Sequence, residues 1–232
     1  MVKSSKRYRE CLKLVDRDKA YILEEAISVL REVPRTRFDE TVELSFKLGI
    51  DPKKSDQMVR GTVSLPHGTG KSLRVAVFCK SEQAGLAEEA GADFVGSDEL
   101  IRKVQSGWLE FDVAIATPEM MRELSKVGRI LGPRGLMPSP KSGTVSQDVA
   151  RVVGEVKKGK IEFKSDKQAG IHVGIGKISF EENALYENAH SLINAVISHK
   201  PAQLKGRYIR SMAVSTTMGP GIKLDLASLK KS

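Results

Sequence analysis

The sequence predicts a mixed α/β protein with two domains, one antiparallel-sheet α+β domain built from both chain ends and one doubly wound α/β domain inserted between them. Segments near both ends alternate apolar and polar residues, as strands with one wet face do. The middle instead has continuous apolar strands alternating with helical segments. A length of 232 residues suits two ordinary domains. We place the discontinuous domain at 1–66 and 160–232, and the inserted domain at 67–159.

The N-terminal third begins with a basic, polar arm at 1–9. Apolar residues over 22–33 then recur at three- and four-residue spacing, which predicts a helix that Pro34 ends. Strict alternation over 41–48 predicts a strand with one buried face, and a second short strand is expected at 59–65. One helix and two strands bury little core by themselves, so this third needs a partner elsewhere in the chain.

The middle third predicts parallel β-α units. Ser97 and Thr117 are expected to cap helices, and Pro118 fits the first helical position. A loop rich in Gly and Pro follows at 132–140. The expected strands lie at 73–79, 93–95 and 111–116, with helices at 82–90, after 97, after 117 and at 148–158. Buried strands that alternate with helices are typical of a small Rossmann-like domain.

The last third returns to alternating segments. A hairpin is expected from strands at 160–164 and 170–175 around a turn at 165–169. A long amphipathic helix at 181–199 follows, then a final strand at 208–218 and a polar, Lys-ending tail. The helix residues expected to face inward are Leu185, Ala189, Leu192, Ile193, Val196 and Ile197. Because the two ends share this style, we expect them to fold together, with the middle as an insertion.

Charge gives the first functional indication. The net charge of +9 is uneven, because 1–66 carries +3, 160–232 carries +5 and the middle is almost neutral. A basic excess attracts polyanions through phosphate neutralisation and counterion release. The alternative is a solvated surface with a few extra lysines. Segregation to the two ends favours a nucleic-acid site that they form jointly.

Several classes of protein are disfavoured. No apolar run approaches a membrane span of about 20 residues, so we expect no membrane partner. No signal-peptide core follows the basic start, and Cys11 and Cys79 form no disulfide or zinc pattern, so a cytoplasmic protein is expected. The four histidines lack metal-ligand spacing, and the acidic residues are scattered. We therefore expect no enzyme, metal, cofactor or small-molecule substrate.

A Gly-Lys segment at 66–72 superficially matches a phosphate-binding loop. The first glycine position is Leu65, however, and a strand follows where a helix is needed. The alternative function is a nucleotide-binding enzyme of the doubly wound class, which would need a phosphate site after Cys79 or Ala116. The four residues directly after Cys79, at 80–83, include no glycine, and Glu119 brings an acid where phosphate would sit.

Polar strand faces give the candidate site. If the strands stack in one sheet, their short and hydroxylated side chains form a flat surface that a sugar–phosphate backbone can approach closely. The alternative is an ordinary solvent face. The set comprises Thr41, Glu43, Ser45, Lys47, Glu162, Lys164, His172, Gly174, Ser211, Ala213, Ser215 and Thr217. Only 5% of residues are aromatic, which argues against recognition by base stacking, although Phe38 fits either RNA packing or a plug at the end of the core.

Longer motifs carry a family resemblance. They are FDETVE at 38–43, LGIDP at 48–52, VRGTVSLPHG at 59–68, GRILGPRGLMP at 128–138, IEF at 161–163 and STTMGP at 215–220. Together they closely resemble the bacterial large-subunit ribosomal protein L-one family, from about residue 6 to 220. The resemblance implies the two domains described above, with the main RNA contacts on the first.

The resemblance also implies a function. Such a protein binds large-subunit ribosomal RNA, forms the mobile stalk beside the tRNA exit site and helps to release deacylated tRNA. Its partners are that RNA, exit-site tRNA and, as a translational repressor, its own operon mRNA; off the ribosome it is a monomer. The residues expected to contact RNA are Arg37, Phe38, Thr41, Lys47, Ser165, Asp166, Lys167, His172, Ser211, Ser215, Thr217, Met218 and Gly219. Arg37 and Lys47 would meet phosphates, and Gly219 would permit close approach by lacking a side chain.

Overall fold

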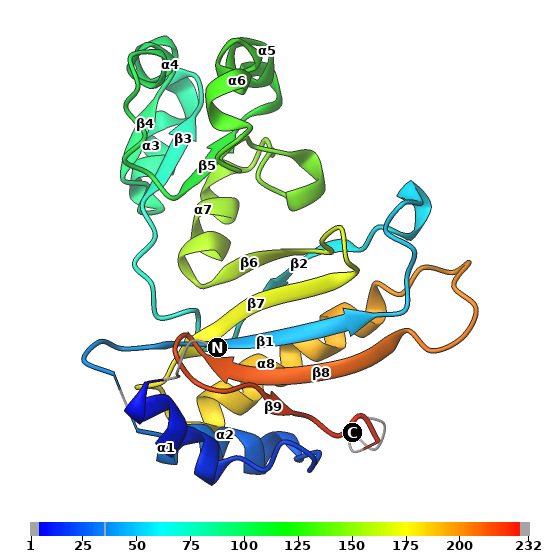
Figure 1. Ribbon diagram of the computed structural model, residues 1–232. Helices are drawn as coiled ribbons and strands as arrows, with labels where there is room; N and C mark the ends of the chain where they lie inside the picture. Colours follow the sequence, from blue (N-terminus) through cyan, green and yellow to red (C-terminus); the bar gives the residue numbers. More distant parts are fainter. Residues whose placement is uncertain (1–4, 35, 228–232) are drawn as a thin grey trace. The chain divides into compact units, whose positions relative to one another are not determined.

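The computed structural model describes residues 5–34 and 36–227, and it confirms a mixed α/β protein (Figure 1). The chain divides into two compact units, one formed by 1–70 with 162–232 and the other by 71–161. The first four residues of the polar arm and the last five of the Lys-ending tail lie outside the described residues. Among the helices described, none is both long and apolar enough to cross a membrane.

The main sheet of the first unit has four strands in the order β7-β1-β8-β9. β1 (Thr41–Leu48) pairs antiparallel with β7 (Gly170–Lys177) and with β8 (Ile209–Thr216), and β8 pairs with the short β9 (Ile222–Lys223). Burial alternates along β1 as expected, with every second side chain inside. β9 lies in a segment that the sequence indicated only as a polar tail.

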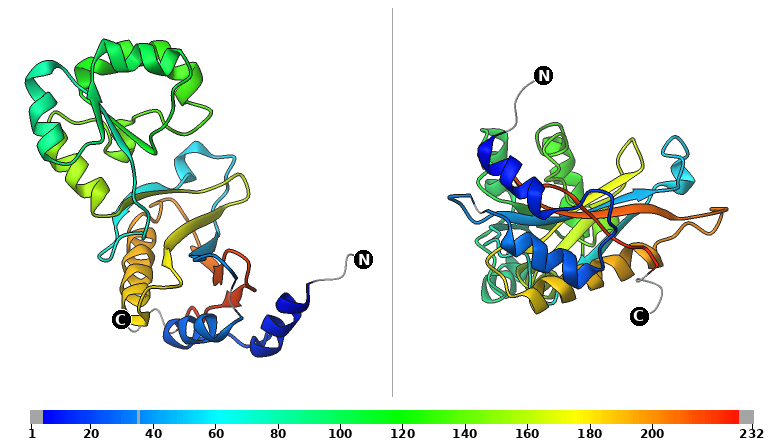
Figure 2. Two further views of the ribbon diagram at one scale, coloured as in Figure 1. Left: turned by 90° about the vertical axis from the view of Figure 1, so that its left-hand side faces the viewer. Right: turned by 60° about the horizontal axis from the view of Figure 1, so that its bottom comes forward.

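Helices cover the apolar face of this sheet. α2 (Leu23–Glu32) and α8 (Glu182–Ser198) pack against each other and against the sheet on the same side (Figure 2). Most of the residues expected to face inward on α8 are buried. Ile197 is a wrong prediction, because it is 43% exposed and borders a surface cavity at the end of the helix.

The first helix, α1 (Lys6–Leu14), was not expected from the polar arm. Only Cys11 in it is buried, so the segment carries almost no apolar periodicity. The Ser5 hydroxyl caps it by accepting a hydrogen bond from the Tyr8 amide at 3.2 Å.

The expected hairpin between 160–164 and 170–175 is also wrong. β6 (Lys160–Lys164) pairs instead with β2 (Arg60–Ser64), and the two form a separate two-stranded sheet. The short turn η1 (Ser55–Gln57) precedes β2 in the chain. The loop between β6 and β7 is closed by its own hydrogen bonds, since Asp166 accepts from the amides of Gln168 and Gly170. β6 and β7 therefore leave this loop toward different partners, and Glu162 and Lys164 lie outside the main sheet.

The second unit contains a three-stranded parallel sheet in the order β4-β3-β5. Alternate side chains of these strands enter two different hydrophobic clusters, so helices cover both faces. The strands are β3 (Val75–Phe78), β4 (Phe94–Gly96) and β5 (Val113–Ala116). α3 (Ser81–Glu89) and α7 (Val149–Lys157) lie over one face, and α4 (Asp98–Gln105) lies over the other.

Helix capping in this unit departs from expectation. Ser97 and Thr117 occupy N-cap positions, but neither side chain makes a capping hydrogen bond. The helix expected after Thr117 is broken into four short turns, and a fifth, η4, lies at the end of the Gly- and Pro-rich loop. These turns are η2 (Pro118–Met120), α5 (Met121–Leu124), η3 (Ser125–Val127), α6 (Gly128–Leu131) and η4 (Pro140–Ser142).

Candidate nucleic-acid interface

The side of the main sheet opposite α2 and α8 forms a surface of short polar side chains, here called the open face. Its three central rows run across β7, β1 and β8, whose registers align them. In that strand order the rows are Gly170, Lys47 and Ser211; His172, Ser45 and Ala213; and Gly174, Glu43 and Ser215. Five predicted site residues thus share this face or its end, namely Thr41, Lys47, His172, Ser211 and Ser215. The short side chains on β8 leave space for a sugar–phosphate backbone.

One end of the open face is cationic. The Lys47 ammonium donates to the Gln168 carbonyl at 2.5 Å, and Lys167 stands exposed on the same loop. Arg210 is a further exposed cation, because a bulge in β8 inserts it where Lys47 and Leu48 pair with Ser211 and Ile209. Within the described chain these three cations form no ion pair, so their charge is available to phosphate. Sequence periodicity missed Arg210, since alternation alone cannot locate a bulge.

The middle of the open face combines an imidazole ring with carboxylates. The His172 ring lies 3.0 Å from the Ser45 hydroxyl, 3.6 Å from the Glu43 carboxylate and 4.0 Å from Asp166. The Gly170 amide, with a second main-chain amide and nearby cations, holds the pKa of Asp166 below its usual range despite some desolvation. Asp166 therefore stays ionised. By accepting hydrogen bonds from two main-chain amides, it shapes the loop that carries Lys167.

The turn after β8 is held from several sides. The Thr217 hydroxyl accepts from the Thr41 amide at 3.1 Å, and the Met218 amide donates to the Glu40 carboxylate at 2.9 Å. Arg7 of α1 donates to the Met218 carbonyl at 2.6 Å. The Met218 side chain is nevertheless 52% exposed. Thr217 therefore has a structural role at this edge, whereas Met218 presents a free apolar group.

Three predicted site residues need correction or refinement. Ser165 is buried and its hydroxyl accepts from the Val59 amide at 3.2 Å, so it does not reach the surface. A Cβ on Gly219 would come 2.3 Å from the Thr216 hydroxyl, so packing inside the turn already requires glycine there. Phe38 is 53% exposed, which rules out the plug at the end of the core. Arg37 is exposed beside it and forms no ion pair with any described residue.

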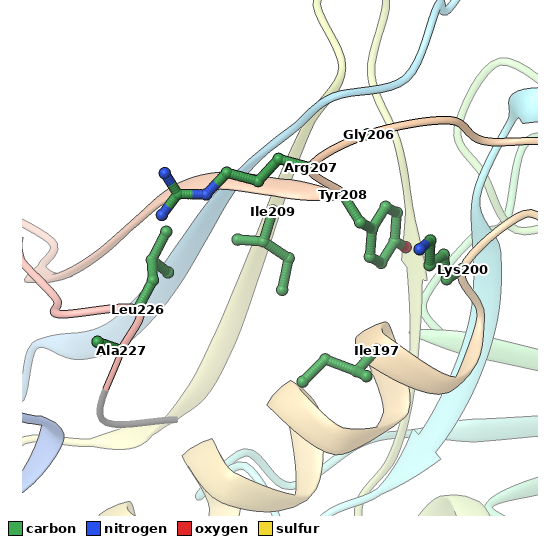
Figure 3. Close-up of a pocket in the computed structure, with 8 residues that line it drawn as sticks. All are labelled: Ile197, Lys200, Gly206, Arg207, Tyr208, Ile209, Leu226 and Ala227. Atoms are coloured by element: carbon green, nitrogen blue, oxygen red, sulfur yellow. The ribbon is translucent and has the colours of Figure 1, made fainter. Parts of the chain in front are cut away.

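A surface cavity outside the open face lies between the end of α8 and the start of β8 (Figure 3). It measures about 740 Å³, and its lining is largely apolar, with Ile197, Ile209 and Leu226 contributing. Lys200 and Arg207 add cations, and the Tyr208 hydroxyl is engaged by the Val196 carbonyl at 3.1 Å. No predicted site residue lines it. Among the described residues, no His, Cys, Asp and Glu cluster could hold a metal ion either.

Comparisons with known proteins give a consistent result. Residues 30–220 match the model of the ribosomal protein L1p/L10e family. A large ribosomal subunit protein uL1 from Kosmotoga olearia is 58% identical over 225 residues, which is 97% of each chain. The protein of the same name from Chlamydia pneumoniae is 55% identical over all 232 residues of both chains. Another from Persephonella marina is 55% identical and covers 100% of this chain and 98% of its own.

Proposed function

Because this chain belongs to the ribosomal protein L1p/L10e family, we propose that it binds large-subunit ribosomal RNA directly through the open face of its main sheet. Membership makes it a structural protein of the large subunit of the cytoplasmic ribosome, and not an enzyme. What remains to be assigned is the surface that meets RNA and the chemistry that it uses.

The observation that carries this proposal is the composition of the open face. Its cations, Lys47, Lys167 and Arg210, lie at one end and form no ion pair with any described residue, although the charge of Lys47 interacts with that of Asp166. Along β8 it presents serine and alanine, whose short side chains impose little steric barrier. Phosphates would meet the cations, while serine hydroxyls would meet 2′-hydroxyls and fix the register. Recognition would then depend on RNA shape rather than on base stacking.

We assign the RNA-binding domain to 1–66 with 160–232, and a weaker contact with a second RNA segment to the inserted domain at 67–159. Two observations support the assignment. Every strand of the open face comes from 41–48, 170–177 or 209–216. Eight of the nine net positive charges also fall in the two end segments.

Two further roles follow from the family resemblance alone. The protein would form the mobile stalk beside the tRNA exit site and help to release deacylated tRNA. It would also repress translation by binding its own operon mRNA through the same open face. If one face serves both RNAs, a ribosomal RNA fragment and the mRNA leader should compete for the protein, and simultaneous binding of both would disprove a shared surface.

The central test places a charge in the middle of the open face. Ala213→Glu adds bulk and negative charge between Ser45 and the β9 edge without altering a buried side chain. The matched control, Ala184→Glu, makes the same change on α8, which covers the opposite side of the sheet. We expect Ala213→Glu to weaken binding to a ribosomal RNA fragment by roughly tenfold or more, because the new carboxylate repels the RNA phosphates when both lie in the interface.

A salt titration separates phosphate contacts from other effects. Removing the Lys47 charge with Lys47→Gln should lower the slope of log affinity against log salt by about 1. Circular dichroism verifies that each variant keeps its fold. Equal RNA affinity of Ala213→Glu and Ala184→Glu would show that the RNA lies elsewhere.

A further inference from the structure

Arg7 of α1 connects two segments that lie at the ends of different strands. Its Nη1 donates to the Pro34 carbonyl at 3.1 Å, and its Nη2 donates to the Met218 carbonyl at 2.6 Å. Pro34 precedes β1 and Met218 follows β8, so one guanidinium joins the chain before one strand to the chain after the other. Figure 1 shows α1 outside the sheet, near the end of β8. The planar fork of a guanidinium suits two acceptors at once.

The partners of Arg7 identify it as a residue that orders main chain. Its side chain is half-buried, and its two long-range hydrogen bonds both end on main-chain carbonyls. The thiol of Cys11, which is fully buried, is a weaker acceptor at 3.8 Å. Hydrogen bonds from an ionised donor are stronger than those between neutral groups. Arg7 therefore fixes the path of the backbone on both sides of the contact.

Glu40 makes a matching connection between the same two segments. Its carboxylate is buried, accepts from the Met218 amide at 2.9 Å and accepts further hydrogen bonds from Thr36. The main chain of Met218 is thus held at its amide by Glu40 and at its carbonyl by Arg7. The segment before β1 is held by the same pair, at Pro34 by Arg7 and at Thr36 by Glu40.

The two segments held in this way carry side chains that we expect to contact RNA. Arg37 and Phe38 lie in the segment before β1, and Met218 lies in the turn after β8. All three side chains are exposed, and the last two can pack against RNA through apolar groups. A loop that must become ordered on binding lowers affinity, so hydrogen bonds that order it beforehand raise affinity.

We propose that Arg7 is a positioning residue for RNA binding, which holds the Phe38 segment and the Met218 turn in the arrangement that RNA meets. Arg7 itself touches no RNA and acts through the main chain of these two segments. This inference rests on the proposed function, because it takes RNA to lie against the open face and the turn at its end. It gives α1 a part in RNA affinity, although α1 contributes no strand to that face.

The test compares the affinity of full-length variants for a ribosomal RNA fragment. Arg7→Gln removes both the charge and the fork, and it should weaken binding about fivefold. Arg9→Gln is the matched control, because it removes the same charge from an exposed position on the same helix, and it should bind like the parent protein. Arg7→Lys keeps the charge without the fork, so it should lose most of the same affinity.

The salt dependence of binding shows whether Arg7 meets RNA directly. Arg7→Gln should keep the slope of log affinity against log salt, because no phosphate contact is lost. A slope that falls by about 1 would instead place the guanidinium on a phosphate and overturn the proposal. Circular dichroism at the temperature of the titration verifies that each variant is folded. Should Arg7→Gln fail to fold, Arg7→Lys carries the test.

A double-mutant cycle separates positioning from general stabilisation of the fold. In a protein that already carries Phe38→Ala and Met218→Ala, Arg7→Gln should weaken binding by less than about twofold, because the side chains through which it acts are gone. A residue that only stabilises the fold would weaken binding by the same factor in both backgrounds.

The proposal is wrong if Arg7→Gln binds as tightly as Arg9→Gln, if Arg7→Lys keeps full affinity, or if the loss is the same in both backgrounds. Ala213→Glu, measured in the same series, distinguishes this failure from that of the proposed function. If Ala213→Glu weakens binding and Arg7→Gln does not, only the role of Arg7 is disproved. If Ala213→Glu binds like the parent protein, the open face is not the RNA surface and both proposals are wrong.

Discussion

Asn188 of α8 should be a principal stabilising residue of the discontinuous unit. It is fully buried, and its side chain satisfies three main-chain groups. The amide oxygen accepts from His67 N at 3.0 Å, while the amide nitrogen donates to the carbonyls of Gly68 at 2.9 Å and Ile175 at 2.7 Å. One side chain thus fixes the segment after β2 to both α8 and β7.

Replacement by alanine leaves these three groups without partners. At about 1 kcal/mol for each net hydrogen bond, Asn188→Ala should lower the free energy of unfolding by about 3 kcal/mol. With an m-value of about 2 kcal/mol/M, this corresponds to a urea midpoint that falls by about 1.5 M. Asn194→Ala is the matched control, since Asn194 lies on the same helix but is exposed, and it should change stability by under about 0.5 kcal/mol.

Two spectroscopic signals separate the units. Trp108 is the single tryptophan and belongs to the second unit, whereas far-ultraviolet circular dichroism follows both. Asn188→Ala should therefore move the dichroism transition of the discontinuous unit and leave the fluorescence transition in place. An equal shift of both signals, or a result identical to Asn194→Ala, would refute the reasoning.

Asn188→Asp gives the same site a pH dependence. A carboxylate facing two carbonyls in the interior has its pKa raised above the unfolded value by burial and by their repulsion. The protonated form is then favoured in the folded state, so the variant is most stable below the unfolded pKa and loses stability as pH rises through the folded one. The difference in free energy of unfolding between Asn188→Asp and the parent protein should be largest at neutral pH. A difference that stays constant between about pH 3 and pH 7 would contradict this.

Three further outcomes are expected. Burial raises the pKa of Glu40, but hydrogen bonds from hydroxyls and main-chain amides outweigh it and hold the pKa below the usual range. Ionised Glu40 therefore stabilises the fold above the unfolded pKa, and this stabilisation is lost as pH falls through the folded pKa. Glu40→Gln should make the measured loss of stability at low pH less steep. Gly49→Ala would place a Cβ 2.2 Å from the Arg207 carbonyl and should lower thermal stability by about 1–3 kcal/mol, whereas Gly85→Ala, with open space around it, should raise stability by about 0.5–1 kcal/mol. Burial raises the pKa of Tyr208 to about 12, so an absorbance titration should show a late phenolate step that Tyr208→Phe abolishes.

Local patterns predicted the elements that have one apolar face. β1 and α8 show clear periods, and their buried residues follow those periods with the exception of Ile197. α1 was missed because a helix with one buried residue has no apolar stripe. The pairing of β6 with β2 was missed because alternation shows that a strand exists but not which strand it pairs with.

The candidate site was predictable to the same extent. Alternation placed Lys47, Ser211 and Ser215 on one face, and the register of the sheet brings them together. Periodicity could not show that Ser165 turns inward or that Arg210 is displayed by a bulge, because both depend on neighbouring strands.

The position of β1 between β7 and β8 has a consequence for synthesis. β1 is translated early, but its two neighbours begin at residues 170 and 209. The contiguous segment 71–161 can complete its own sheet while the rest is still being made, whereas β1 must wait for almost the whole chain. A nascent polypeptide therefore lacks the surface proposed to bind RNA until translation is nearly finished.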